Sequence, residues 1–183
     1  MAAVSYDPGT MQDEDPRARL IAGMVEDLGW CLNSYGQIEF LFGDVLWSAI
    51  SMDEYREIAG DFPHGLDNRA KRLRKVLASP GRLSPYAADL LLLLERLEEL
   101  SEPRHLFAHG HCTFVYTPDG DAGMIIRRFV PPRRGTGGQY ERIELLVRPQ
   151  KLREARYLWC TFASTAQRII GSMYLDLGLE QIG

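Results

Sequence analysis

The sequence predicts a mainly α-helical protein: an antiparallel, up-down helical bundle with a small three-stranded antiparallel β insertion before the last helix. Apolar residues recur at three- and four-residue steps in several long segments, which is the period of an α-helix. Between about residues 111 and 147 the pattern changes to the alternation typical of strands, and helical spacing returns after Pro149. With 183 residues and no internal repeat, the chain is expected to form one domain.

The N-terminal segment differs from the rest of the chain. Residues 1–16 contain four acidic residues, no basic ones and few side chains that could pack in a core. We therefore expect a flexible acidic tail, followed by a single domain over residues 17–183. Pro16 suits the first position of a helix, where a missing backbone N–H costs no hydrogen bond.

Helical spacing predicts helices over residues 17–50, 53–59, 66–78 and 84–100. Gly29 and Gly36 predict a bend in the first of these, or two helices end to end. Ser84 precedes a proline and is expected to be the N-cap of its helix. This helix has five consecutive leucines over residues 90–94, which point all round it and predict cover on more than one side. Pro103 predicts that this helix is kinked, or that a new helix starts, at about residues 101–103.

Strand-like alternation predicts strands over residues 112–116, 124–130 and 140–147. The segment Pro118–Asp121 combines turn-forming residues and predicts a hairpin between the first two strands. Pro149 is then expected to begin the last helix, whose apolar stripe continues to Leu177 at three- and four-residue steps.

Composition excludes several classes of protein. A net charge of −4 argues against a general, histone-like binder of nucleic acid, although it allows a local basic site. The three cysteines are far apart and odd in number, which suits a reducing cytoplasm rather than a disulfide framework. No apolar run approaches the about 20 residues of a membrane span. We therefore expect a cytoplasmic protein with no membrane partner.

Three of the four histidines, His105, His109 and His111, fall in one short window. In the simplest interpretation the window is a helix C-terminus, with Gly110 ending the helix and His109 favouring the negative end of its dipole. In a second, His105 and His109 lie four residues apart on one helical face and bind a metal ion such as zinc, with His111 or Cys112 as a further ligand.

The third interpretation is metal-independent cleavage of a phosphodiester, for which Arg104 and His109 are the required side chains. A histidine with an ordinary pKa of about 6.5 can move a proton to or from a ribose hydroxyl. A guanidinium can hold a phosphate and stabilise the extra charge of the transition state. Five positions on an ideal helix correspond to about 140° of rotation. The two side chains can therefore meet only if the helix end is distorted, as Pro103 and Gly110 permit, or in a two-fold dimer.

The segment from Arg104 to Gly110 resembles the hallmark of the HEPN domains. In that family an Arg and a His, four to six residues apart, lie late in a helix of an antiparallel bundle. Arg104 and His109 match with four residues between them, the polar His105 follows the Arg, and small residues surround the His. The stretch Gly36–Leu41 also looks like the first bundle helix of small bacterial members. The resemblance covers about residues 17–177, and its specific part is the Arg–His segment.

The resemblance implies a homodimeric, metal-independent endoribonuclease that needs no cofactor and acts on RNA, in some members as a toxin or defence protein with an antitoxin partner. His109 would move the proton, Arg104 would hold the phosphate, and His105 and His111 would assist. Other members are non-catalytic modules that bind nucleotides, RNA or proteins. Toxins that pair with a nucleotidyltransferase antitoxin carry Tyr two residues after the His, where this chain has His111. The β insertion is also absent from the minimal four-helix domain.

Charged residues elsewhere supply supporting candidates. Residues 127–156 contain nine basic residues against three acidic ones. This stretch predicts an RNA clamp, with Tyr116 or Tyr140 stacking on an unpaired base, or else an ordinary hairpin whose charges meet acidic side chains of the helix before it. The residues expected to bind RNA in this clamp are Arg127, Arg128, Arg133 and Arg134. Glu39 borders the apolar stripe of the first helix, where it either orients Arg104 or lies at the edge of the core.

Overall fold

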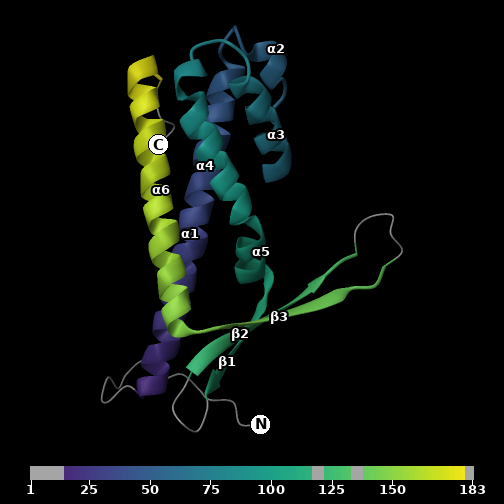
Figure 1. The fold of residues 1–183 in the computed structure, drawn as a ribbon, viewed down its shortest axis with the longest axis vertical. Coiled ribbons are helices and arrows are strands. Elements are labelled where there is room, and N and C mark those ends of the chain that lie inside the picture. Colours follow the sequence, from purple (N-terminus) through teal and green to yellow (C-terminus); the bar gives the residue numbers. More distant parts are fainter. Residues whose placement is uncertain (1–14, 117–121, 133–137, 180–183) are drawn as a thin grey trace, which may run out of the picture.

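The computed structural model describes residues 15–116, 122–132 and 138–179 (Figure 1). The chain is mainly helical, and a three-stranded antiparallel sheet precedes the last helix, as predicted. Most of the predicted acidic tail and the predicted hairpin turn over residues 118–121 lie outside the described residues. Among the residues that are described, no helix is both long and apolar enough to cross a membrane.

The first helix, α1 (Pro16–Ile50), is continuous over 35 residues. Asp15 caps it, because its carboxylate accepts a hydrogen bond from the backbone N–H of Arg17 at 3.0 Å. Pro16 occupies its first turn, as the sequence predicts. Gly29 and Gly36 do not interrupt the helix, so the predicted pair of helices is wrong. Packing along the whole stripe outweighs the small helix propensity lost at two glycines.

Four shorter helices and one 3₁₀ turn follow: α2 (Arg56–Ala59), α3 (Leu66–Leu77), η1 (Ser84–Tyr86), α4 (Ala87–Glu99) and α5 (Ser101–His109). The predicted N-cap at Ser84 is wrong, because Ser84 begins the 3₁₀ turn and its hydroxyl accepts a hydrogen bond from the N–H of Gly81 at 2.9 Å. The restart before Pro103 is confirmed by the separate helix α5. On α4, Leu90, Leu93 and Leu94 are buried, whereas Leu92 is 66% exposed.

The longest helices, α1 and α6 (Pro149–Leu177), lie side by side and run in the same direction (Figure 1). Their contacts show the shared direction: Asp27 meets Arg156, Ser34 meets Cys160 and Ser48 meets Tyr174. The α4–α5 pair runs the opposite way, from the far end of the bundle to the sheet. The α1, α4–α5 and α6 segments thus alternate in direction, and the sheet joins the end of α5 to the start of α6 at the end of the bundle where α1 begins.

The sheet has the order β1-β2-β3, with β1 (His111–Tyr116), β2 (Ala122–Val130) and β3 (Glu141–Val147). One face of β2 packs against the helices through Met124 and Ile126, which form a second small core with Leu106 of α5 and Leu152 of α6. β1 begins at His111, opposite Arg127, so the later part of β2 pairs with β3 alone and forms with it a two-stranded arm that projects from the bundle (Figure 1).

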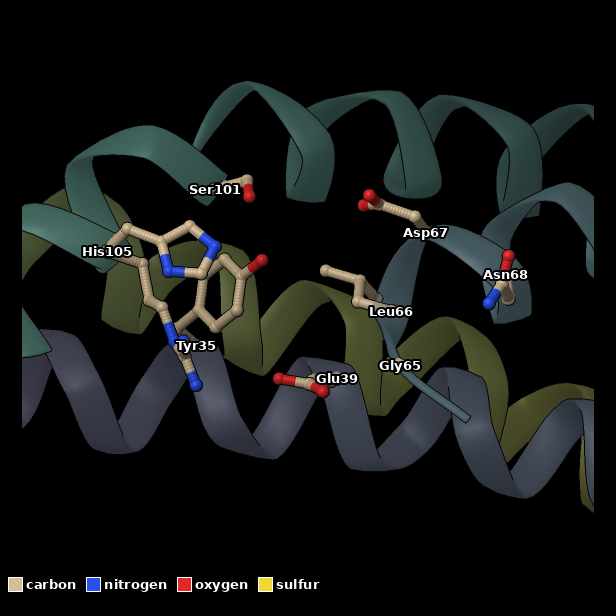
Figure 2. Close-up of a pocket in the computed structure, with 9 residues that line it drawn as sticks. Tyr35, Glu39, Gly65, Leu66, Asp67, Asn68, Ser101 and His105 are labelled. Carbon is tan, nitrogen blue, oxygen red and sulfur yellow. The ribbon is translucent and has the colours of Figure 1, made fainter. Parts of the chain in front are cut away.

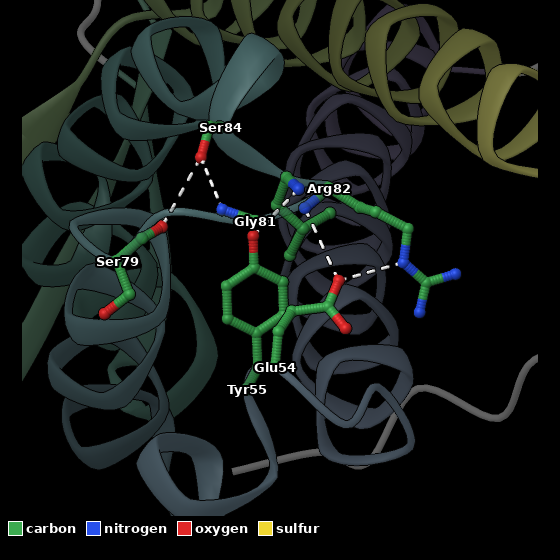
Figure 3. A network of polar contacts seen from close by, with 7 residues as sticks. Glu54, Tyr55, Ser79, Gly81, Arg82 and Ser84 are labelled. Carbon is green, nitrogen blue, oxygen red and sulfur yellow. Dashed lines mark hydrogen bonds and ion pairs between the residues drawn. The ribbon is translucent and has the colours of Figure 1, made fainter.

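A polar network fixes the loop between α3 and η1 at the far end of the bundle (Figure 3). The hydroxyl of the buried Tyr55 accepts a hydrogen bond from the backbone N–H of Leu83 at 2.9 Å. Glu54 accepts a hydrogen bond from the guanidinium of Arg82 at 2.9 Å. The loop therefore packs on the segment that follows α1, which sets the start of the descending pair α4–α5.

We predict that Tyr55→Phe lowers the free energy of unfolding by about 1–3 kcal/mol, because it leaves the buried N–H of Leu83 without a partner. Tyr86→Phe is the matched control, since it removes an exposed hydrogen bond to Asp176 of 2.9 Å. That variant should change stability by less than about 0.5 kcal/mol. Urea denaturation measures both, and equal losses in the two variants would contradict this account of the loop.

Candidate functional site

Helix α5 carries Arg104, His105 and His109 and places them at the junction with the sheet. The helix is regular to its end, where the N–H of Gly110 donates to the carbonyl of Leu106 at 2.9 Å. The distorted helix end that would let Arg104 meet His109 is therefore absent. The two side chains stay about 140° apart, as on an ideal helix.

A first pocket of about 300 Å³, which we call the α5 pocket, opens between α1, α3 and α5 (Figure 2). Its lining residues are Tyr35, Glu39, Gly65, Leu66, Asp67, Asn68, Ser101, Arg104 and His105. Tyr35 and Glu39 come from α1, Ser101 and His105 from α5, and the remaining labelled residues from the start of α3. The pocket thus combines two carboxylates with one guanidinium and one imidazole.

Arg104 is held against α1. Its guanidinium carbon lies 5.5 Å from the centre of the Tyr35 ring, within the range of a cation–π contact. Tyr35 is buried, and burial raises the pKa of its phenol, although a hydrogen bond with Ser101 and the positive charge of Arg104 act in the opposite direction. Tyr35 is a residue that the sequence analysis missed, because its spacing marks it only as part of the core stripe.

Glu39, which is expected either to orient Arg104 or to lie at the edge of the core, makes no ion pair with Arg104 within the described residues. Its carboxylate lies 3.7 Å from the guanidinium of Arg69 on α3, and both of these side chains are about a quarter exposed. Glu39 and Arg104 nevertheless line the same pocket. The role of Glu39 as the residue that orients Arg104 is therefore unsupported by a direct contact.

His105 lies beside Arg104 and stacks on His109. The two imidazole centres are 5.8 Å apart and their planes differ by 28°. The Nδ1 atom of His105 is buried and, within the described residues, has no hydrogen-bond partner. Burial lowers the pKa of His105, and the charges of Arg104 and Arg128 lower it further. The lowered pKa favours the uncharged imidazole, which has a ring nitrogen able to accept a proton.

A second pocket of about 400 Å³, which we call the sheet pocket, lies on the other side of the α5 terminus. It is lined by His109, His111, Arg127, Arg128, Phe129 and Arg142. His111, Arg127 and Glu144 face one another across the three strands, and Phe129 faces Arg142. Directly opposite residues share a face of a sheet. The outer face of the arm thus presents cationic side chains beside an exposed aromatic ring.

Acidic side chains hold these arginines but do not neutralise them all. Glu144 accepts hydrogen bonds from Arg127 at 2.7 Å and from Arg142 at 2.8 Å. Arg127 also donates to the hydroxyl of Thr113 at 3.1 Å. Arg128 lies 3.6 Å from Glu102 of α5, and its buried Nη1 makes no hydrogen bond within the described part of the chain. Two arginines therefore share one carboxylate, which leaves net positive charge on this face.

The structure brings together some of the predicted site residues and separates others. Arg104, His105 and Glu39 line the α5 pocket, whereas His109, His111, Arg127 and Arg128 line the sheet pocket. The predicted clamp residues Arg133 and Arg134 lie outside the described residues. Phe129 was missed, and Arg142 was counted in the basic stretch but not named as a clamp residue, because only the strand register brings them beside Arg127.

The two tyrosines predicted to stack on bases differ in position. The hydroxyl of Tyr116 donates to the carbonyl of Arg17 at 3.2 Å, so this side chain ties β1 to the start of α1. Tyr140 is 68% exposed beside the arm. Across the described ranges of the chain, no three His, Cys, Asp or Glu side chains gather into a group that could hold a metal ion.

Comparisons with protein-family models, with curated proteins and with solved structures find no match to this chain. We therefore infer a function from the two pockets and from α5, which contributes residues to both.

We predict that the pKa of His105, followed by NMR of its ring protons, lies below the ordinary histidine value of about 6.5. Arg128→Gln should raise this pKa, because it removes a positive charge that disfavours the protonated ring. Glu102→Gln should lower it, because Glu102 favours the protonated ring. Shifts of the same sign in both variants would contradict the electrostatic explanation.

Proposed function

We propose that this protein is a HEPN-like, metal-independent endoribonuclease. The observation that carries the proposal is the stacked pair His105–His109 on α5, which lies between Arg104 on one side and the cationic sheet pocket on the other. Histidines able to move protons and guanidinium groups able to hold phosphate are the groups that cleavage of RNA without a metal requires.

In the proposed reaction His109 removes the proton from a ribose 2′-hydroxyl. The 2′-oxygen attacks the adjacent phosphorus, the bond between phosphorus and the 5′-oxygen breaks, and the protonated ring of His109 gives the proton that it took to that leaving oxygen. The products are a 2′,3′-cyclic phosphate and a 5′-hydroxyl. His105 supports the ring of His109 by stacking, and its lowered pKa favours the uncharged form of His105 beside that ring. Arg104 stabilises the negative charge on the phosphate.

The separation of Arg104 from His109 within one chain makes a homodimer part of the proposal. A two-fold arrangement of chains with α5 near the axis would bring a second copy of each side chain into one cleft. The guanidinium of one protomer could then act with the imidazole of its partner. Within a single chain, Arg104 faces the α5 pocket, where His105 is the imidazole that accompanies it.

Binding of RNA or nucleotides without cleavage is the second candidate. The division of Arg104 and His109 between two pockets favours it, because neither pocket of a single chain contains the full pair. The carboxylates of Glu39 and Asp67 beside Arg104 count against the role of Arg104 in cleavage, since negative charge there opposes a phosphate, and they leave the sheet pocket as the site for binding.

We predict that the protein cleaves labelled single-stranded RNA in the presence of EDTA and leaves 2′,3′-cyclic phosphate ends. His109→Ala and Arg104→Ala should each reduce the cleavage rate by at least about 100-fold, the usual contribution of a proton-transfer group or a charge-stabilising donor. Gel analysis of the labelled products measures both the rate and the chemistry of the ends.

His64→Ala is the matched control, because His64 is exposed and lines neither of these pockets. It should cleave at the rate of the unmodified protein. Loss of cleavage in all three variants would point to contaminating nuclease or damaged protein. RNA that binds but stays intact would contradict the proposed reaction and would establish the second candidate.

A further inference from the structure

The sheet pocket contains more than the proposed reaction uses. The reaction needs His109 from this pocket, whereas Arg127, Arg142, His111 and Phe129 have no part in the chemical step. These four side chains share the outer face of the sheet, since His111 lies opposite Arg127 and Phe129 lies opposite Arg142. The geometry points to a binding site for the RNA strand beside the cleaved bond.

We propose that the sheet pocket holds a neighbouring phosphate of single-stranded RNA between Arg127 and Arg142 and stacks an unpaired base on Phe129. This inference rests on the proposed function for the position of the cleaved bond. It adds the substrate class: the strand is unpaired at this position, because a ring that stacks on a base needs the face of that base to be free.

The arginines are held in position before any ligand binds. Arg127 uses Nε to contact Glu144 and Nη1 to contact Thr113, and Arg142 uses Nη2 to contact the same Glu144. Each guanidinium keeps at least one nitrogen that these bonds do not engage. Fixed donors bind a phosphate with a smaller loss of side-chain entropy than mobile ones. The half-exposed Glu144, 44% accessible, therefore orients the site and also reduces its charge.

Phe129 supports the assignment of an unpaired base. Its side chain is 68% exposed on the arm, where β1 no longer covers β2. The cationic pocket and this exposed ring lie side by side, and together they provide the charged groove and stacking platform typical of proteins that bind single strands. His109 and His111 border the same pocket, so a strand held here passes the α5 terminus.

The test measures binding of a fluorescent 2′-O-methyl RNA single strand by anisotropy. This probe lacks the nucleophilic hydroxyl, so binding is measured whether or not the protein cleaves RNA. Arg142→Gln should weaken binding and reduce the slope of log affinity against log salt by about 0.7, the value for one phosphate contact on a single strand. Phe129→Ala should weaken binding at least about fivefold.

Glu144→Gln provides the second variant, and it should strengthen binding several-fold because it removes the negative charge that the two arginines share. Simple loss of structure would weaken binding instead. Arg168→Gln, on an exposed arginine of α6 outside the sheet pocket and outside the basic stretch 127–156, is the matched control and should leave the affinity within about twofold.

Two results would overturn the inference: equal weakening by Arg142→Gln and Arg168→Gln, or tighter binding of the matching RNA duplex than of the single strand. The result of this binding test can be told apart from the result of the cleavage test of the proposed function. If RNA binds with the expected variant effects but ordinary RNA is not cleaved, the result supports the binding site and contradicts the proposed ribonuclease activity. If ordinary RNA is cleaved but these variants do not change binding, the result contradicts the binding site and supports the proposed ribonuclease activity.

Discussion

The close packing of α5 on the sheet at Gly110 is the constraint on which the rest of the site depends. A Cβ atom at this position would clash with the side chain of Ile126 and with the carbonyl of Leu106. The backbone angles of Gly110 (φ −80°, ψ 146°) are open to any residue, so lack of space is the reason for glycine. Because helix and strand meet so closely, His109 and His111 on either side of Gly110 border one pocket.

The distribution of ion pairs explains how an acidic protein presents a basic surface. The net charge is −4, and several acidic side chains pair with arginines outside the site, as Glu98 does with Arg74. Glu99 likewise pairs with Arg96 on its own helix. In the sheet pocket basic side chains outnumber acidic ones, because Arg127 and Arg142 share the single carboxylate of Glu144. Local excess of charge, rather than net charge, determines where a phosphate chain can bind.

Periodicity predicted the helices and strands well, because apolar spacing records which face of each element is buried. It could not predict features set by contacts between elements. Ser84 has the sequence of an N-cap, yet its hydroxyl bonds to the loop before it. Arg104 and His109 form a motif in sequence, yet a regular helix places them in different pockets. Arg142 joins Arg127 only through the register of β2 and β3, which one sequence does not reveal.

The central claim is that the α5 terminus and the outer face of the sheet form one site for an RNA strand. Histidine ring resonances, followed by NMR while a 2′-O-methyl RNA is added, test it most directly because the four histidines occupy different places. The account predicts saturable shifts of His109 and His111, with His64, which lies before α3, unchanged. Bound RNA that leaves His109 and His111 unshifted would contradict it.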